Sequence, residues 1–350
     1  MHNKQIMISE LREIVQKNCH IADAAHAADY TLCIYLLKMR ELYRWEQDEA
    51  FSTNLPNKTV GTWLRQREEL WEELEQNKFQ NLTLGKESIS PFESDLINNN
   101  LSKHQLVYSG GMGINNRPHF FLAELEFFEQ SENYTLYIAG KEYARDMSAP
   151  PAMSHNNTIY IRKESFRRLL WEKLETWRWN KPDNALGRAF ACYDCENNLD
   201  TALAHMTDTE IKNVIQHESG EIQAGNLLGE KWHDLLFSLP HSKATIMLRA
   251  VRDHLADSLT TLPALLALNS TPSWHFYFGN LNNMRKDLYP SIIEGYDEWY
   301  KSESLSKMKD IIEQGQHHWL QLCQQILQID ETDIKSQQNK IQNLIEQNRL

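Results

Sequence analysis

Apolar residues recur with a helical period along most of the chain, and the pattern changes in one central segment. Apolar positions three and four residues apart predict helices over residues 5–48 and about 59–79. The same period returns at Glu164 and predicts helices over 164–179, 184–205, 207–236, 242–268, 273–300 and 302–328. Between these regions, residues 104–163 hold short runs rich in Tyr, Phe, Ile and Thr, separated by turn residues, which are typical of strands.

These elements predict a mainly α, α+β fold, in which a helical bundle carries a small inserted antiparallel β-sheet. Residues 1–103 form an N-terminal helical segment that packs on the C-terminal bundle, because too much of it is apolar to stand alone. Residues 104–163 form the sheet, with the break at 146–157 as a loop between its last two strands. The bundle covers 164–330, and the polar tail 331–350 is either a docking helix or a frayed end.

Composition and charge narrow the classes of partner. The chain is 41% hydrophobic, so it can bury a large core, and its net charge of −12 argues against nonspecific binding to nucleic acid or anionic membrane. The N-terminus does not show the pattern of a signal peptide, and the apolar run "YTLCIYLLKM" is too short to span a bilayer. Five cysteines, an odd number, fit a reducing compartment. We expect a cytoplasmic protein with no membrane or nucleic-acid partner; the oligomeric state stays open.

The stretch "VIQHESGEIQAGNLLG" at 214–229 places ionisable side chains on the apolar side of a predicted helix. His217, Glu218 and Glu221 lie within the apolar arc, and His217 and Glu221 are four residues apart, so both can reach one ligand. A buried carboxylate costs several kcal/mol unless a cation or hydrogen bonds compensate. The pattern indicates either a metal or acid–base site, or a tight helix crossing with buried hydrogen bonds, for which Gly225 and Gly229 provide space.

Two further segments pair histidine with a carboxylate on an apolar side. The first holds His20, Asp23 and His26, and the second holds His254 and Asp257. Each alone fits a hydrogen-bonded core pair. Because helix bundles build metal sites from facing helices, the segments together support the hypothesis of one convergent site for a divalent metal: zinc, iron or manganese. The expected metal ligands are His217, Glu221, His254, Asp257, His20, Asp23 and His26, and the expected catalytic general base is Glu218.

Two classes of function follow. The first is a metal-dependent enzyme, either a hydrolase or an oxidoreductase, that acts on a small-molecule substrate at this site. The alternative is a noncatalytic helical interaction or scaffold protein, whose buried polar residues fix helix packing. Metal analysis of the purified protein distinguishes the two.

Overall fold

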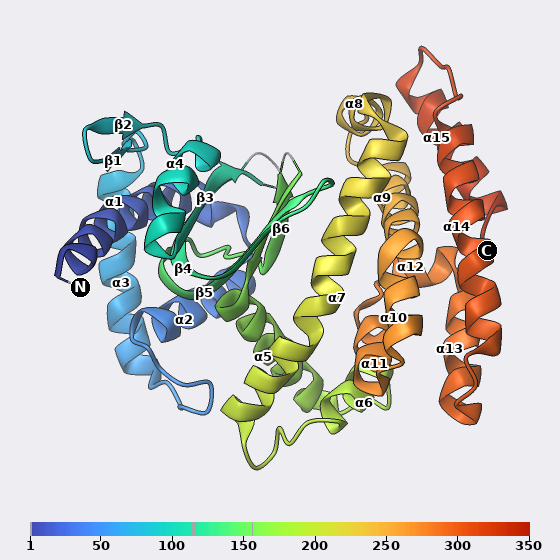
Figure 1. The fold of residues 1–350 in the computed structure, drawn as a ribbon, viewed down its shortest axis with the longest axis horizontal. Coiled ribbons are helices and arrows are strands. Elements are labelled where there is room, and N and C mark those ends of the chain that lie inside the picture. The colour runs from blue at the N-terminus through green and yellow to red at the C-terminus, as the bar shows by residue number, and fades with distance from the viewer. Residues whose placement is uncertain (1, 114–116, 156) are drawn as a thin grey trace. The chain divides into compact units, whose positions relative to one another are not determined.

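The computed structural model describes residues 2–113, 117–155 and 157–350 (Figure 1). The chain divides into two compact units, and each is described by itself. The first unit comprises residues 1–173 and 195–207, and the second comprises 174–194 and 208–350. Two helices, α5 and α7, have residues in both units.

The first unit combines helices with a sheet. Its helices are α1 (His2–His26), a 3₁₀ turn (Ala27–Asp29), α2 (Leu32–Glu46), α3 (Asn57–Leu74), α4 (Ser94–Leu101), a second 3₁₀ turn (Ser102–His104), and the N-terminal parts of α5 (Lys163–Asn180) and α7 (Leu199–Leu228). The predicted helix over 5–48 is therefore two helices. Tyr30 is extended, and the preceding Asp29 is held by His26 and by Arg117, at 3.1 and 3.2 Å.

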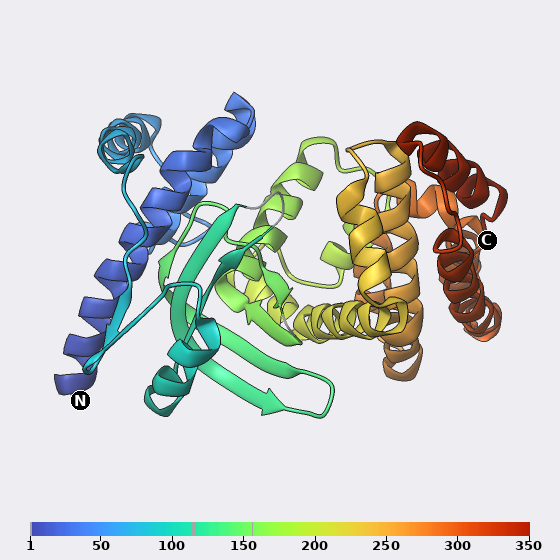
Figure 2. The same cartoon turned by 90° about the horizontal axis from the view of Figure 1, so that it is seen from above.

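The predicted fold class, a helical bundle with a small antiparallel insertion, is wrong, because the sheet is a curled, mixed, five-stranded sheet in an α+β protein (Figure 2). Its strands run in the order β3-β4-β5-β7-β6. They are β3 (Leu106–Met112), β4 (Pro118–Gln130), β5 (Thr135–Arg145), β6 (Ala152–His155) and β7 (Thr158–Arg162). A separate two-stranded sheet joins β1 (Leu82–Leu84) to β2 (Glu87–Ile89).

The parallel pair in this sheet has a local cause. The break at 146–157, predicted as a loop, contains β6, which pairs antiparallel with β7. Asn157, with a φ of 60°, takes the left-handed conformation that Asn tolerates and directs the chain into β7. Because β6 occupies the chain between β5 and β7, β7 returns in the same direction as β5 and pairs with it in parallel.

Residues on both faces of the sheet are buried around the first half of β4, whereas the second half of β4 is mostly exposed. The two-residue alternation of β4 turns Phe120 and Leu122 toward α1, where they join the apolar residues Leu11, Val15 and Cys19. The intervening residues of β4 face the opposite side and pack with residues of β5 and β7, in a cluster of Val107, Phe121, Ala123, Tyr137, Ala139 and Tyr160. The second cluster is formed by residues of the sheet itself, as expected of a curled sheet.

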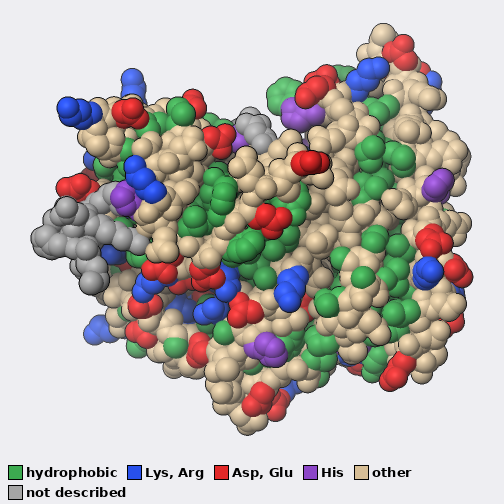
Figure 3. All heavy atoms as spheres, viewed as in Figure 1, with side chains coloured by type: hydrophobic (Ala, Val, Ile, Leu, Met, Phe, Trp, Pro, Cys, Tyr) green, Lys and Arg blue, Asp and Glu red, His purple; other side chains and the backbone are tan. Residues whose placement is uncertain are grey.

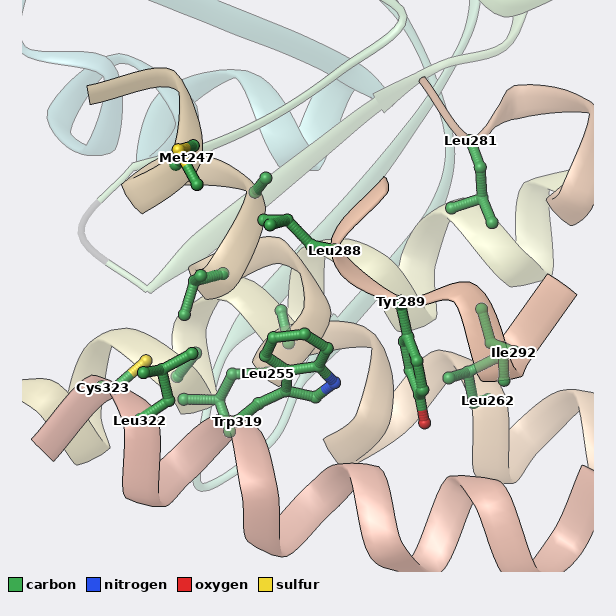
Figure 4. Close-up of a cluster of buried hydrophobic side chains, with 14 of the residues drawn as sticks. Met247, Leu255, Leu262, Leu281, Leu288, Tyr289, Ile292, Trp319, Leu322 and Cys323 are labelled. Carbon is green, nitrogen blue, oxygen red and sulfur yellow. The ribbon is translucent and has the colours of Figure 1, made fainter. Parts of the chain in front are cut away.

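The described part of the second unit is helical. It contains α6 (Ala185–Ala191), most of α7, α8 (Glu230–Ser238), α9 (Lys243–Ala256), a π-helical turn (Asp257–Thr261), α10 (Leu262–Leu268), α11 (Thr271–Asn280), α12 (Asn283–Leu288), α13 (Pro290–Ser302), α14 (Ser306–Ile326) and α15 (Ile334–Gln347). Figure 4 shows its core, in which Trp319, Leu322 and Cys323 of α14 pack toward Leu255 of α9 and Tyr289.

The C-terminal tail is a docked helix. Ile341 and Ile345 of α15 are fully buried in the core of the second unit. The backbone of Leu350 exchanges hydrogen bonds with Leu288 and Ser291, at 3.0 and 3.1 Å. Of the two alternatives left open by the sequence, the structure therefore shows the docking helix.

Two observations bear on location. Among the described residues, no helix has both the length and the apolar character needed to cross a membrane. All five cysteines, Cys19, Cys33, Cys192, Cys195 and Cys323, are free thiols.

Candidate functional site

His217 and Glu221 lie one turn apart on α7, and their side chains point toward other helices of the second unit. Their nearest atoms, Nε2 of His217 and Oε1 of Glu221, are 3.5 Å apart, and both side chains are only partly exposed, at 31% and 25%. Glu221 also accepts a hydrogen bond from Nη2 of Arg252 on α9, at 3.1 Å. Glu218, the expected general base, lies on the same helix and is half-buried.

Asp257 is the centre of a polar network that joins several helices. Its side chain is 1% exposed, and Oδ1 accepts from Nδ1 of His217 at 2.7 Å and from the hydroxyl of Thr261 at 3.0 Å. Oδ2 accepts from the hydroxyl of Tyr277 at 2.8 Å and from Nη2 of Arg285. The carboxylate thus ties α7, α11 and α12 to the π-helical turn in which it lies. We call this set of residues the Asp257 network.

The Asp257 network balances its charges internally. Burial alone would lower the pKa of His217, but the charge and hydrogen bond of Asp257 raise that pKa well above its usual value. Burial would raise the pKa of Asp257, but the positive charges of Arg285 and His217 hold it below its usual range. At neutral pH the charged groups of the network are therefore an imidazolium, a guanidinium and a carboxylate in contact.

Gly220 allows this close crossing. A Cβ at position 220 would lie 2.4 Å from the carbonyl oxygen of Ala256 and 2.4 Å from the hydroxyl of Thr260. That hydroxyl donates to the carbonyl of Gln216 at 2.6 Å. The prediction that Gly225 and Gly229 provide space for this crossing is wrong. A Cβ at position 225 would meet nothing within 4 Å, and Gly229, with a φ of 67°, separates α7 from α8.

His254, another expected ligand, faces away from His217. Its Nε2 donates to the carbonyl of Arg285 at 2.9 Å, and its ring stacks on Trp319 at 4.7 Å between centroids. Burial, with a smaller contribution from the positive charge of Arg285, lowers the pKa of His254 to about 3. It is therefore a neutral core histidine.

The N-terminal candidates belong to the first unit. His20 is buried against Arg67 and Trp71, whose Nη1 and Nε1 atoms lie 2.8 and 3.3 Å from its ring nitrogens, and burial lowers its pKa to about 3. Asp23 accepts from the backbone N–H of Met147, 3.0 Å from both oxygens. His26 contacts Asp29 near the surface.

The structure brings together His217, Glu221 and Asp257, but it does not bring His254 into their contact. Among the described residues, no three His, Cys, Asp or Glu side chains are grouped so that they could hold a metal ion. His20, Asp23 and His26 lie in a different unit from the other candidates, so convergence of all the segments on one metal stays a prediction.

The first unit contains a second candidate site, which the sequence analysis missed. A cavity of about 230 Å³ is lined by four arginines, Arg44, Arg145, Arg167 and Arg168. We call it the arginine cavity. Its other lining residues are the acidic Glu41, Asp48, Glu49, Glu164 and Asp200, and Trp45, Ala50 and Phe51. On the surface shown in Figure 3, Lys and Arg side chains lie among Asp and Glu side chains.

Three of these arginines are deficient in hydrogen-bond partners. Five buried nitrogens of these three arginines have no partner among the described residues: Nε and Nη2 of Arg145, Nε of Arg167, and Nε and Nη1 of Arg168. Nη2 of Arg168 donates to the carbonyls of Ser148 and Ala149, and its Nε lies 3.7 Å from Oε1 of Glu172, beyond hydrogen-bond range. Buried donors are normally satisfied, and all five of these nitrogens belong to side chains that line the cavity.

Like charges are crowded in the arginine cavity. The side chain of Arg145 is 2% exposed, and burial together with the charge of Arg168 lowers its pKa to about 10. The same two causes, burial and the charge of Arg168, lower the pKa of Lys38. Arg44 differs, because its guanidinium is paired with Glu41 at 3.2 Å and donates to the carbonyls of Ala50 and Thr53. An anion in the cavity would offset the repulsion between Arg145 and Arg168.

Local structure explains how these arginines meet. Arg145 ends β5, and α5 starts directly after β7, the strand that pairs with β5. On α5, Glu164, Arg167 and Arg168 are three and four residues apart and share one face. The usable sequence signal was Arg168, which lies among apolar positions in "ESFRRLL". Arg145 has no comparable signal, because its surroundings are set by tertiary packing.

Comparison with known proteins identifies a family at the level of sequence. The N-terminal domain model of a family of unknown function (DUF6866) matches residues 10–162, and its C-terminal domain model matches residues 167–348. No curated protein and no solved structure matches the chain.

Proposed function

The chain belongs to the DUF6866 family, and we propose that it is a binding protein for small anionic molecules, with the arginine cavity as its ligand site. The observation that carries the proposal is the set of five buried, unpaired nitrogens on Arg145, Arg167 and Arg168. Leaving a buried donor unsatisfied costs about 1–3 kcal/mol, and more for a charged group. A bound oxyanion would satisfy several of these donors at once.

The surroundings support a small ligand. Concave, partly aromatic walls with a few fixed polar groups are typical of small-molecule sites. Trp45 and Phe51 supply the aromatic surface, and Trp45 also stacks against Arg145, whose Cζ lies 5.1 Å from its ring centroid. Because the overall charge is −12, we propose that the ligand is a small molecule and not a nucleic acid.

The experiment is calorimetric titration of the full chain at low salt with inorganic phosphate, sulfate, acetate and succinate, and with neutral glycerol. We expect one-to-one binding of at least one anion and none of glycerol. Arg145→Met should weaken that binding at least tenfold. The matched control is Arg12→Met, which removes an exposed arginine of α1 and should leave binding unchanged.

Arg145→Lys serves as a second variant, because it keeps the charge but loses the planar donor fork. Intermediate affinity for this variant, with an unchanged circular dichroism spectrum for all three variants, supports the cavity as the site. If no anion binds the folded wild-type protein at millimolar concentration, the proposal is wrong.

The Asp257 network supports a different role for the second unit. Its donors and acceptors mainly satisfy one another, as expected of a buried polar network that fixes helix packing. We therefore propose for these residues the noncatalytic role named as the alternative in the sequence analysis, in which buried polar residues fix helix packing. Metal-dependent hydrolysis or oxidation at His217 and Glu221 stays a separate prediction, which elemental analysis of the purified protein tests.

We also propose a cytoplasmic location. The odd number of cysteines and their free thiols support it. Thiol titration of the unreduced, denatured protein should detect most of the five cysteines. Detection of only one would contradict the proposed compartment.

A further inference from the structure

The arrangement of donors in the arginine cavity distinguishes between classes of anion. This inference rests on the proposed function and concerns the ligand of the same site. A carboxylate has two oxygens, whereas a phosphoryl group presents three strong acceptor oxygens. The five unpaired nitrogens come from three arginines located on two different elements, the end of β5 and the face of α5. Donors that approach from several directions suit a tetrahedral group better than a planar one.

The charge of the buried part of the cavity favours a dianion. Arg44 is paired with Glu41, which leaves the guanidinium groups of Arg145, Arg167 and Arg168 facing one further lining carboxylate of the buried part, Glu164. A nearby carboxylate, Glu142, is bound by Arg162 through two hydrogen bonds of 2.9 Å and lies 3.6 Å from Nη1 of Arg145, and Glu172 lies 3.7 Å from Nε of Arg168. The positive surplus is therefore between one and two charges, and a phosphate monoester carries about −1.5 to −2 at pH 7.

The more exposed lining residues carry the opposite charge. Asp48, Glu49 and Asp200 lie in the lining together with the half-buried Phe51. The side chain of Asp48 is 86% exposed and lies 3.5 Å from Nζ of Lys141, an exposed pair that solvent screens. Asp200 is held in place, because it accepts from the backbone N–H of Phe51 at 3.0 Å and from the hydroxyl of Ser52 at 2.6 Å. A second anionic group on the ligand would be repelled here, and an ammonium group would be attracted.

Volume limits the rest of the molecule. Sites for drug-sized ligands range over about 300–1,000 Å³. The arginine cavity, at about 230 Å³, is below that range, so only a short chain or small ring fits between its buried and exposed parts.

We infer that the arginine cavity takes a small phosphate monoester that carries an amino group. The phosphoryl group binds Arg145, Arg167 and Arg168, and the ammonium group lies beside Asp48, Glu49 and Asp200. The expected ligand class is therefore a zwitterionic phosphomonoester of low mass.

The test is calorimetric titration of the full chain with three probes of similar length. O-phosphoethanolamine has both groups, ethyl phosphate lacks the amine, and β-alanine replaces the phosphoryl group by a carboxylate. We expect O-phosphoethanolamine to bind about tenfold more tightly than ethyl phosphate, and β-alanine to bind at least tenfold more weakly than either. The double variant Asp48→Asn, Glu49→Gln leaves only Asp200 of the three carboxylates, so it should reduce the difference between the first two probes without weakening the binding of ethyl phosphate.

Each alternative outcome has a distinct meaning. Equal affinity for O-phosphoethanolamine and ethyl phosphate in the wild type overturns the inference about the amine. Binding of β-alanine, acetate or succinate in preference to phosphates overturns the inference about the phosphoryl group, while the proposed anion-binding function stands. Failure of every anion to bind overturns both proposals.

Discussion

The Asp257 network and the arginine cavity both bury charged side chains, but they differ in how those charges are satisfied. In the network, each oxygen of Asp257 accepts two hydrogen bonds, and one arginine nitrogen, Nε of Arg285, lacks a partner among the described residues. In the cavity, five arginine nitrogens lack one. Burial of charge is therefore not by itself evidence of a ligand site. The balance of donors and acceptors separates a group that holds helices together from a group that has room for an external partner.

The largest expected effect is the loss of stability when Asp257 is replaced. Asp257→Ala leaves Arg285 as a buried positive charge without its acceptor, and it removes the main cause that raises the pKa of the partly exposed His217. Removing one partner of a buried ion pair typically costs about 3–5 kcal/mol. Urea unfolding should show this decrease in the free energy of unfolding. The control is Asp297→Ala, an exposed aspartate of α13, which should change it by less than about 0.5 kcal/mol. A loss below about 1 kcal/mol for Asp257→Ala would contradict the structural role of the network.

The next largest change in stability is expected at Gly220, where α7 passes close to Ala256 and Thr260. Gly220→Ala should destabilise the protein by about 1–3 kcal/mol, because the new methyl group would overlap the carbonyl of Ala256. Gly225→Ala is the matched control on the same helix. Nothing lies within 4 Å of its added Cβ, so the higher helix propensity of alanine should stabilise the protein by up to about 1 kcal/mol. Differential scanning calorimetry measures the thermal stability of both variants and of the wild type. Equal effects at the two positions would show that α7 does not cross closely at Gly220.

A smaller effect is expected at the cavity. Arg145→Met should lower the free energy of unfolding by about 1 kcal/mol, less than Asp257→Ala does. The substitution removes the ion pair of Arg145 with Glu142, at 3.6 Å, but it relieves repulsion from Arg168, and Glu142 keeps its hydrogen bonds from Arg162 and Ser165. The same urea titration measures it. A loss as large as that of Asp257→Ala would place Arg145 in a structural network and remove the contrast between the two regions.

The smallest expected effect is the pH dependence of stability that His217 causes. The pKa of His217 is raised in the folded state, so protonated His217 stabilises the fold. This stabilisation is fully present below the unfolded pKa of about 6.5, and it is lost as pH rises through the folded pKa. The difference in unfolding free energy between wild type and His217→Gln should therefore be largest below pH 6.5 and decrease above it. A difference that grows with rising pH would show that His217 is neutral in the fold. His254→Gln should not show this profile, because His254 is neutral when folded.

Local periodicity predicted the helices well where packing follows the sequence. The expected helix over 164–179 is α5 at Lys163–Asn180, and the expected 242–268 is the continuous run from α9 through α10. Periodicity did not reveal the break at Tyr30 or the parallel pairing of β5 with β7. At the break, Asp29 contacts Arg117, which is distant in sequence. The parallel pairing follows from β6, a short strand within the segment that was predicted to be a loop.

The candidate sites show the same limit. Spacing on one helix indicated His217 and Glu221, and an apolar surrounding indicated Asp257. Their arginine partners, Arg285 and Arg252, lie on other helices, and only the tertiary structure brings them into contact. The cavity was missed because Arg145 and Arg168 lie on a strand and a helix that only tertiary structure brings together.

The long-range anchoring of α1 has a consequence for synthesis of the protein. Gln16 and Asp23 bind the backbones of Arg145 and Met147, which are 129 and 124 positions further along the chain. On a ribosome that adds about 5–20 residues per second, α1 therefore waits roughly 6–25 s for its strand to appear. During that time its apolar face, including Leu11 and Val15, has no native cover. The nascent first unit is thus the stage at which chaperone binding and premature aggregation compete, and slower translation of the β4–β5 region should favour aggregation.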